Sequence, residues 1–257
     1  MKPLITIIIL FLFSAIQAQS INQLDAKGQK QGAWKVTYEN GKTKYEGTFK
    51  DNKPTGLMKR YFEDGSLKAE MYYYALTDKS HAKLYFDNGV LAGEGNYIGN
   101  QKDSTWNYYS YYTKTLSMTE IYVNTAKQGP TTRYYPNGKK AEITEWSNNQ
   151  HHGKWLQYYE NDQLHLDATY NKGKREGKYA TYYPDGKTET IGTFANDLME
   201  GDWIYYLPDG KEEMKVQYIN GIAQNSEELK QKKQQLFELI EKNKGKIPEP
   251  EENNFLK

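Results

Sequence analysis

The segment Gly177–Lys187 has the sequence Gly-Lys-Tyr-Ala-Thr-Tyr-Tyr-Pro-Asp-Gly-Lys, and this pattern decides the fold class. Aromatic side chains occupy much of the segment up to an Asp-Gly pair, where a tight turn is expected. An Asp-Gly or Asn-Gly pair between two aromatic-rich runs is a strong indication of a β-hairpin, because these residue types tolerate positive φ. The segment therefore predicts a first strand and the turn of a hairpin.

The same pattern recurs through most of the chain. Each copy starts with a small residue, which we count as position 0 of repeats 1 to 8. The starts are Gly32, Gly56, Ser80, Ser104, Gly129, Gly153, Gly177 and Gly201. Successive starts are 24 residues apart, except for 25 residues between repeats 4 and 5. Such a fixed period is typical of repeat architectures.

Aromatic rings occupy fixed positions in these repeats. Position 2 carries the tryptophans that we expect to be structural: Trp34, Trp106, Trp155 and Trp203. Position 5 carries the tyrosine ladder: Tyr61, Tyr85, Tyr109, Tyr134, Tyr158, Tyr182 and Tyr206. Position 17 closes the second strand with another ring, which in repeat 4 is displaced by one residue to Tyr122. The extra residue predicts a longer or bulged turn near Tyr111–Lys114.

If each Asn-Gly or Asp-Gly pair forms a two-residue turn, two residues face each other across the hairpin when their position numbers in the repeat add up to 17. Trp34 then faces Gly47, a large ring over a small partner. Rings at positions 2, 6 and 17 share one side of the sheet, and the tyrosine ladder shares the other with charged residues such as Lys44 and Glu46. A three-residue turn with a glycine bulge is the alternative, and it would reassign the strand faces by one residue. Links of four to six residues, such as Asp197–Gly201, are expected between hairpins.

These patterns predict an all-β fold, namely an elongated single-layer antiparallel β-meander of eight 24-residue hairpin repeats with a C-terminal α-helix. The expected segments are a signal peptide at 1–18, an N-terminal lead-in at 19–31, the repeats at 32–223, an amphipathic helix at 225–244 and a disordered tail at 245–257. Apolar residues of the helix, including Phe237, Leu239 and Ile240, are expected to cap the sheet. A free, solvated helix is the alternative.

The N-terminal residues are typical of a secretory signal peptide. Lys2 precedes the apolar block Leu4–Phe13, and small residues up to Ala18 follow it. A membrane-anchoring helix is the alternative, although the polar run from Gln17 offers no stop-transfer pattern. We therefore expect an exported chain without an integral membrane segment after cleavage, located in the periplasm, outside the cell or at the cell-envelope surface.

Composition narrows the function classes. The chain has 24 tyrosines, eight phenylalanines and five tryptophans, and 34 basic residues nearly balance 33 acidic ones. Balanced charge argues against nucleic acid, which requires a basic surface, and weakens a lipid-surface function. The absence of cysteine excludes disulfides, a thiol nucleophile and a thiolate metal site.

The recurring Gly-x-Trp-x-x-Tyr-Tyr-x-x-Asn/Asp-Gly-Lys resembles the bacterial MORN-repeat variant. It is present in Gly153–Gln163, with Asp162 in place of the second glycine, and in Gly177–Lys187; the lead-in at 22–34 is also similar. The likeness covers residues 22–223, and repeats 3 and 4 depart most from it. Members of that family are often catalogued as YwqK-like antitoxins, so the resemblance implies toxin neutralisation, which a signal peptide fits poorly.

No catalytic cluster is recognisable, and we expect neither an enzyme nor a cofactor nor a metal. His151 and His152 are adjacent in an expected link without a third ligand nearby, so a solvated link is favoured over a metal site. Asp-Gly pairs such as Asp185-Gly186 are explained by turn chemistry and lack the spacing of calcium loops.

The position-5 tyrosines either stabilise the sheet by cross-strand packing or bind a partner, since tyrosine is enriched at interfaces. The function expected from these observations is a non-catalytic exported scaffold that binds a protein or peptide along its aromatic sheet face. A glycan-binding module for cell-envelope polysaccharide and an antitoxin-like, toxin-neutralising protein are the alternatives.

Overall fold

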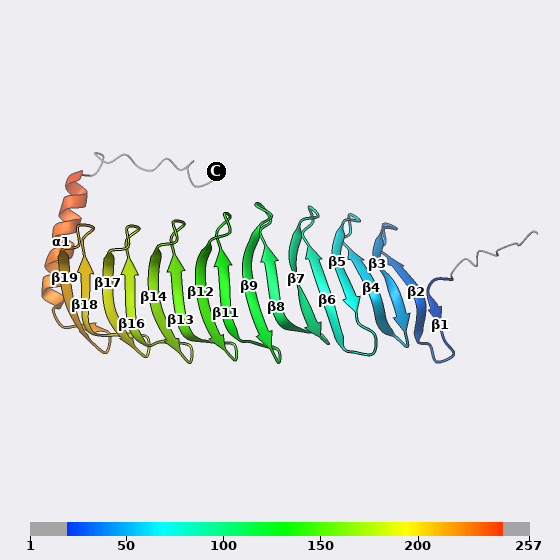
Figure 1. Cartoon of the computed structure of the whole chain (residues 1–257). Coiled ribbons are helices and arrows are strands. Elements are labelled where there is room, and N and C mark those ends of the chain that lie inside the picture. The colour runs from blue at the N-terminus through cyan, green and yellow to red at the C-terminus, as the bar shows by residue number, and fades with distance from the viewer. Residues whose placement is uncertain (1–19, 244–257) are drawn as a thin grey trace, which may run out of the picture. The chain divides into compact units, whose positions relative to one another are not determined.

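The computed structural model describes residues 20–243, so the predicted signal peptide at 1–18 and the predicted tail at 245–257 lie outside the described residues. The chain divides into an N-terminal unit, Met1–Lys102, and a C-terminal unit, Asp103–Lys257. Repeats 1 to 3 belong to the first unit and repeats 4 to 8 to the second. Both units are built from antiparallel strands, each paired with its neighbours along the chain (Figure 1).

The N-terminal unit holds the first seven strands. They are β1 (Gln23–Leu24), β2 (Lys30–Thr37), β3 (Thr43–Lys50), β4 (Lys53–Tyr61), β5 (Leu67–Tyr73), β6 (Lys79–Tyr85) and β7 (Leu91–Ile98). From β1 to β7 each strand pairs with the next one. The result is a meander of hairpins.

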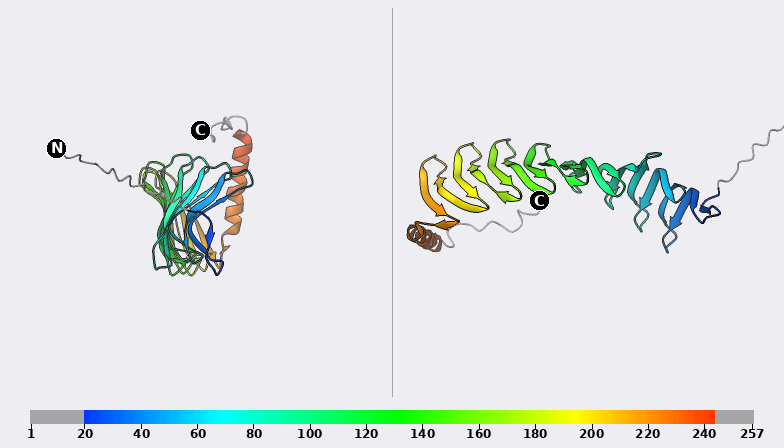
Figure 2. Two further views of the ribbon diagram at one scale, coloured as in Figure 1. Left: turned by 90° about the vertical axis from the view of Figure 1, so that its right-hand side faces the viewer. Right: turned by 90° about the horizontal axis from the view of Figure 1, so that it is seen from below.

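The C-terminal unit begins inside β8 and continues the same pattern. Its strands are β8 (Gln101–Tyr109), β9 (Leu116–Val123), β10 (Ala126–Lys127), β11 (Gly129–Tyr134), β12 (Lys140–Ser147), β13 (Gln150–Tyr158), β14 (Leu164–Asn171), β15 (Lys174–Arg175), β16 (Gly177–Tyr182), β17 (Thr188–Ala195), β18 (Leu198–Tyr206), β19 (Glu212–Ile219) and β20 (Ile222–Ala223). Within each unit the strands form one layer (Figure 2). The all-β, single-layer meander is thus confirmed for both units.

The predicted pairing holds in the body of the hairpins, where positions sum to 17. Trp34 pairs with Gly47, and Trp203 pairs with Val216. Near each turn, however, the register shifts by one residue, as between Val36 and Thr37. The two-residue turn is therefore wrong, although most of the register that it implied is correct.

The observed turn is the three-residue type with a glycine bulge. In repeat 1 the Gly41 amide donates to the Tyr38 carbonyl at 3.0 Å, and the Tyr38 amide donates to the Lys42 carbonyl at 2.8 Å. Gly41 has φ of 79°, whereas neither central residue of the turn has positive φ, as a type I′ turn would need. A second bulge, at Lys44, restores the register beyond the turn.

The bulge also changes the side on which Lys44 lies. Its ammonium lies 5.5 Å from the ring centroid of Tyr38, and the equivalent Lys68 lies 5.1 Å from that of Phe62. Both lysines therefore lie with the position-6 rings rather than with the tyrosine ladder. The prediction that placed Lys44 beside the ladder is wrong, because the extra bulge residue reverses the alternation there.

Most links between hairpins are two-residue turns, shorter than predicted. In the predicted link Asp197–Gly201, residues from Leu198 onward already belong to β18. Asn196 and Asp197 have φ of 52° and 72°, which is the type I′ geometry of a tight hairpin turn. The tight primed turns thus occur at the links and not at the Asn-Gly pairs.

Repeat 4 has the longer turn that its extra residue predicted. The Ser110 amide donates to the Thr115 carbonyl at 2.9 Å, one residue further along than in repeat 1, and Lys114 has φ of 60°. This turn absorbs the insertion, so Trp106 still pairs with Glu120.

The C-terminal helix α1 spans Ser226–Asn243 and follows β20 at the end of the C-terminal unit (Figure 1). Phe237, Leu239 and Ile240 expose 59%, 54% and 56% of their surface. These three side chains therefore do not cap the sheet, contrary to the prediction, and a solvated helix describes them better. None of the helices in residues 20–243 combines the length and apolar character needed to cross a membrane.

Candidate functional site

The hairpin register divides the sheet of each unit into two faces. The face that carries positions 2, 4, 15 and 17 is here named the aromatic face, and the face that carries positions 3, 5 and 14 the tyrosine face. Successive side chains along a strand point to opposite faces, so the assignment follows from the pairing.

The aromatic face is the core of the protein. Trp106 is fully buried, Trp203 is 3% exposed, and Trp34 and Trp155 are partly exposed. The Trp203 ring centroid lies 5.0 Å from that of Phe194, 5.4 Å from that of Tyr179 and 6.3 Å from that of Tyr218. These separations are those of favourable aromatic pairs. In the absence of a second layer, rings of neighbouring repeats cover one another.

Small residues on this face accommodate the ring of the following repeat. A Cβ added to Gly192 would lie 2.2 Å from Cδ2 of Trp203, although the cross-strand partner of Gly192 is Tyr179. Likewise a Cβ on Gly47 would meet Met58, not its partner Trp34, at 3.1 Å. The sequence predicted that a large ring packs on a small residue of the same hairpin. In the structure the large side chain that packs closely on the glycine comes from the next repeat.

Cations cover the aromatic stack at the start of several hairpins. The three closest contacts are Lys30 at 4.6 Å from the Trp34 centroid, Lys127 at 4.3 Å from that of Trp146 and Arg175 at 4.0 Å from that of Phe194. Each cation stands two residues before a repeat start, and a cation over a ring is attracted by its negative face. Sequence reasoning missed this position.

His151 occupies the same position in repeat 6. Its ring centroid lies 3.9 Å from that of Trp146 and 5.0 Å from that of Tyr170, and burial together with the charge of Lys127 lowers its pKa. It is part of the aromatic stack in β13, so the prediction of a solvated link is wrong for His151; His152 is exposed. Within residues 20–243 no group of three His, Asp or Glu side chains is arranged to hold a metal ion.

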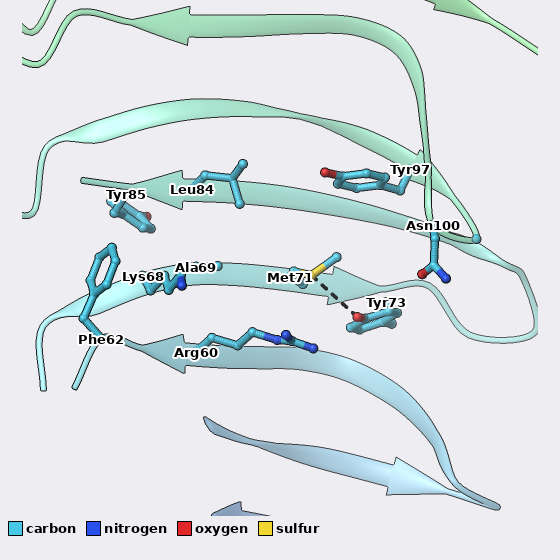
Figure 3. Close-up of a pocket in the computed structure, with 11 residues that line it drawn as sticks. Arg60, Phe62, Lys68, Ala69, Met71, Tyr73, Leu84, Tyr85, Tyr97 and Asn100 are labelled. Atoms are coloured by element: carbon cyan, nitrogen blue, oxygen red, sulfur yellow. Dashed lines mark hydrogen bonds between the residues drawn. The ribbon is translucent and has the colours of Figure 1, made fainter. Parts of the chain in front are cut away.

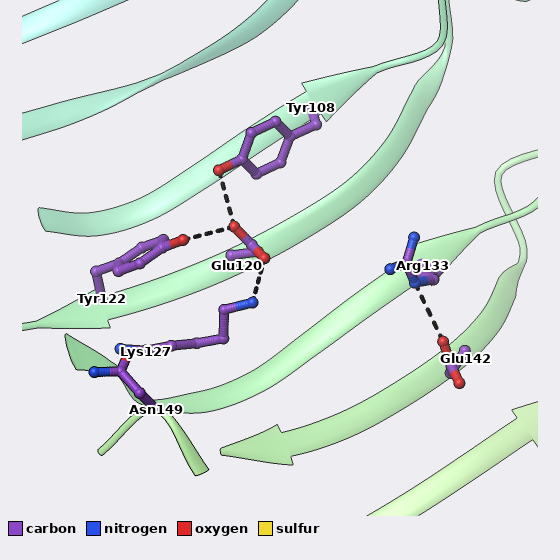
Figure 4. Close-up of polar contacts among 7 residues, drawn as sticks. All are labelled: Tyr108, Glu120, Tyr122, Lys127, Arg133, Glu142 and Asn149. Atoms are coloured by element: carbon purple, nitrogen blue, oxygen red, sulfur yellow. Dashed lines mark hydrogen bonds and ion pairs between the residues drawn. The ribbon is translucent and has the colours of Figure 1, made fainter. Parts of the chain in front are cut away.

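A buried carboxylate interrupts the aromatic face in repeat 4. Glu120 is 7% exposed and forms an ion pair with Lys127 at 2.5 Å, while the hydroxyls of Tyr108 and Tyr122 each donate to it at 2.8 Å (Figure 4). Burial favours the neutral acid, but the hydrogen bonds from Lys127 and the tyrosines outweigh it and hold the pKa of Glu120 below its usual value. Every oxygen has a partner, so this cluster is structural.

The tyrosine ladder lies on the opposite face, and all seven of its members are partly exposed. In the N-terminal unit Tyr61 donates its hydroxyl to Glu46 at 2.6 Å, and Tyr85 donates to Glu70 at 2.9 Å. Burial and then the bonded glutamate raise the pKa of each tyrosine to about 12. These two residues are here named the paired tyrosines.

The glutamates belong to a row of residues that runs across the strands beside the ladder, here named the central row. In the N-terminal unit each member pairs directly with the next, and lysine alternates with glutamate: Lys35, Glu46, Lys59, Glu70, Lys83 and Glu94. One ion pair in the row, Lys59 with Glu70, is 3.3 Å long. This half of the tyrosine face therefore carries a row of alternating charges.

The central row of the C-terminal unit has a different composition. Its directly paired members are Asn107, Thr119, Thr132, Ile143, Leu156, Asp167, Ala180, Ile191, Ile204 and Lys215. Where a glutamate would accept a ladder hydroxyl, this row has Thr119, Ile143, Asp167 and Ile191, and Asp167 forms an ion pair with Lys154 instead. Half of the row is therefore apolar in the second unit, whereas every member of the row in the first unit is charged.

Four ladder tyrosines stand beside this row, and each lies two residues after a member of the row on the same strand. They are Tyr134, Tyr158, Tyr182 and Tyr206, here named the open tyrosines. None of their hydroxyls has a hydrogen-bond partner among residues 20–243, unlike those of the paired tyrosines. Tyr109, the remaining ladder member, does have an interaction partner.

Position-6 tyrosines hold three of the four open tyrosines in place. The Tyr135 hydroxyl donates to the Tyr158 carbonyl at 2.7 Å, and the Tyr183 hydroxyl donates to the Tyr206 carbonyl at 2.7 Å. The bond runs from one repeat to the ladder residue of the next, 23 residues on. Tyr158, Tyr182 and Tyr206 are thus held through their backbone carbonyls while their hydroxyls stay available. Tyr134 differs, because repeat 4 has Ser110 at position 6.

Three solved structures to which the chain is similar are remote in sequence and in fold. They are a point mutant of TarM from S. aureus in complex with fondaparinux, α-GlcNAc-glycerol and UDP (8% identity, TM-score 0.30, 47% of this chain and 21% of that chain), TarM alone (14%, 0.18, 56% and 20%) and a TcdB2-TccC3-Cdc42 structure (14%, 0.19, 71% and 12%). The chain thus spans about a fifth or less of those chains. No curated protein matches it.

The repeats themselves match a known family. The MORN repeat variant matches six segments: 30–51, 54–73, 81–98, 127–148, 152–172 and 175–196. Each matched segment coincides with one hairpin, and the repeats are the structural unit in both halves of the chain. The chain therefore belongs to the family of proteins built from the MORN repeat variant.

Proposed function

We propose that this protein is a non-catalytic, exported scaffold that binds a protein or peptide along the tyrosine face of its C-terminal unit. One observation carries the proposal: four ladder hydroxyls that lack a partner in the described chain stand in register beside a row that contains Ile143, Leu156, Ala180, Ile191 and Ile204. The N-terminal unit provides an internal contrast, because there the same ladder position is bonded to a glutamate.

The chemistry of this surface selects the kind of partner. Tyrosine offers a rigid apolar ring and a hydroxyl that donates a hydrogen bond, at low conformational-entropy cost. Ile143, Leu156, Ile191 and Ile204 are partly exposed beside the rings. A protein segment with apolar side chains and backbone carbonyls complements both features.

Family membership supports the scaffold part of the proposal, because repeats of one kind present a regular, extended surface. Export rests on Lys2 and the apolar block Leu4–Phe13. Cell fractionation tests it: the chain should reach the periplasm or medium in processed form, and a cytoplasmic, unprocessed chain would contradict export.

Peptide selection tests binding even while the natural partner is unidentified. A random peptide library is selected on the purified mature chain, and dissociation constants of the selected peptides are measured for wild type and for a variant with Tyr134, Tyr158 and Tyr182 replaced by Ser. We expect at least tenfold weaker binding with unchanged circular dichroism. Matched removal of Tyr61 and Tyr85 should leave affinity intact.

Two results would overturn the proposal. The first is a set of selected peptides that bind the triple variant as well as wild type. The second is binding of soluble peptidoglycan fragments in preference to any peptide, with loss in the same variant, which would assign the surface to glycan instead.

A further inference from the structure

The aromatic face of the N-terminal unit contains a pocket of about 460 Å³ between repeats 2 and 3 (Figure 3). Ala69, Met71 and Leu84 line it, and the rings of Phe62, Tyr73 and Tyr97 surround them. This volume lies in the range of small-molecule sites.

A ring is missing at position 2 of the repeat beside the pocket. Repeat 3 has Ala82, fully buried, where four other repeats have tryptophan, and its partner across the strands is Met71. With no indole on this part of the sheet, the neighbouring side chains leave space that the same face fills elsewhere, as Trp203 does over Gly192.

Two cations line the pocket. Arg60 is exposed, forms no hydrogen bond or ion pair with residues 20–243, and extends toward Tyr73 (Figure 3). Lys68 reaches the same space because the bulge turns it to the aromatic face, where it lies over Phe62. The burial of Tyr73 raises its pKa, while the charge of Arg60 opposes that shift.

No carboxylate lines the pocket. The acidic residue of β5, Glu70, points to the tyrosine face, where Lys59 and Tyr85 bind it. An unpaired guanidinium beside apolar walls is suited to bidentate recognition of a carboxylate, whose body the rings can cover.

We propose that this pocket binds a small carboxylate with an aromatic or aliphatic body, the carboxylate on Arg60 and the body against Met71 and the surrounding rings. The site lies on another face and in another unit than the open tyrosines. An experiment that refutes carboxylate binding in this pocket therefore leaves the proposed protein-binding surface untouched, and the reverse also holds.

Calorimetric titration of the mature chain tests the site with 3-phenylpropionate and, as a neutral analogue of the same shape, 3-phenylpropanamide. We expect the carboxylate to bind at least tenfold more tightly than the amide. R60Q should weaken carboxylate binding at least tenfold and leave amide binding unchanged. K83Q removes the same charge from the opposite face of β6 and should change neither.

Phenyl phosphate distinguishes the anion class: binding tighter than that of the carboxylate would overturn the assignment to carboxylates. The proposal also fails if acid and amide bind equally, if R60Q binds the acid as wild type does, if K83Q causes the same loss, or if no heat is detected at millimolar 3-phenylpropionate.

Discussion

Substitution of Gly192 by Ala tests the packing of consecutive repeats directly. The new Cβ would lie 2.2 Å from Cδ2, 2.4 Å from Cε2 and 2.8 Å from Cε3 of Trp203, whereas carbon atoms in contact are separated by ~3.5–4.0 Å. The indole cannot retreat freely, because Phe194 lies 5.0 Å from it and its Nε1 donates to the Thr193 carbonyl at 3.1 Å. Backbone or ring must therefore move.

Overpacking of a dense core costs ~1–3 kcal/mol, and a rigid, hydrogen-bonded ring places this variant near the upper end, at about 3 kcal/mol. For a chain of this size the melting temperature should fall by ~6–12 °C. Urea unfolding followed by tryptophan fluorescence and by circular dichroism measures the loss in free energy of unfolding.

A natural counterpart provides the control. Repeat 6 has Ala168 at the position of Gly192, and the next repeat has Tyr179 at the position of Trp203. In the W203Y background, G192A should therefore cost less than about 1 kcal/mol, so the two substitutions should be strongly coupled. A loss below about 0.5 kcal/mol for G192A alone, or equal losses in both backgrounds, would refute the packing between repeats.

Three further predictions concern polar contacts in the C-terminal unit. E120Q removes the ion-pair partner of Lys127 in a buried cluster and should lower the free energy of unfolding by about 3 kcal/mol at pH 7. Because the folded pKa of Glu120 lies below 4.5, the wild type should lose its greater stability as the pH falls through and below 4.5. The urea midpoints of the two proteins should therefore converge at low pH. Y183F removes the hydroxyl that bonds the Tyr206 carbonyl and should cost ~1 kcal/mol in urea unfolding, whereas no change would show the bond to be dispensable. N149A places a side chain without αL preference at φ of 66° and should cost ~1–2 kcal/mol, while N149G should cost less; equal thermal midpoints for the two would contradict the turn assignment.

The sequence predicts the repeat, the antiparallel meander and most of the pairing, because the rings recur at a fixed spacing and the favoured register sets large rings opposite small residues. It did not decide the turn type, since Asn-Gly suits a type I′ turn and also a type I turn that ends in a glycine bulge. The prolines distinguish the two turn types. In Tyr183-Pro184-Asp185-Gly186 the proline stands at the second turn position and the glycine at the fourth, which is the arrangement that a type I turn favours.

The candidate sites were less accessible from sequence. The ladder was visible as a repeated tyrosine, but its division into paired and open members depends on the residue at position 14 of the preceding repeat, Glu46 for Tyr61 and Ile191 for Tyr206. That neighbour is identified only once the pairing between hairpins is known. The pocket was missed because the bulge at Lys68 changes the face of a lysine that simple alternation places on the other side.

The central claim is that the two halves of the ladder serve different purposes, and one pair of variants tests it. The four open tyrosines are replaced by Phe in one variant and the two paired tyrosines in the other, and each is assayed for urea midpoint and for affinity toward the selected peptides. We predict an unchanged midpoint with at least tenfold weaker binding for the first, and a lowered midpoint with unchanged binding for the second. A lowered midpoint with unchanged binding for the open tyrosines would contradict the claim.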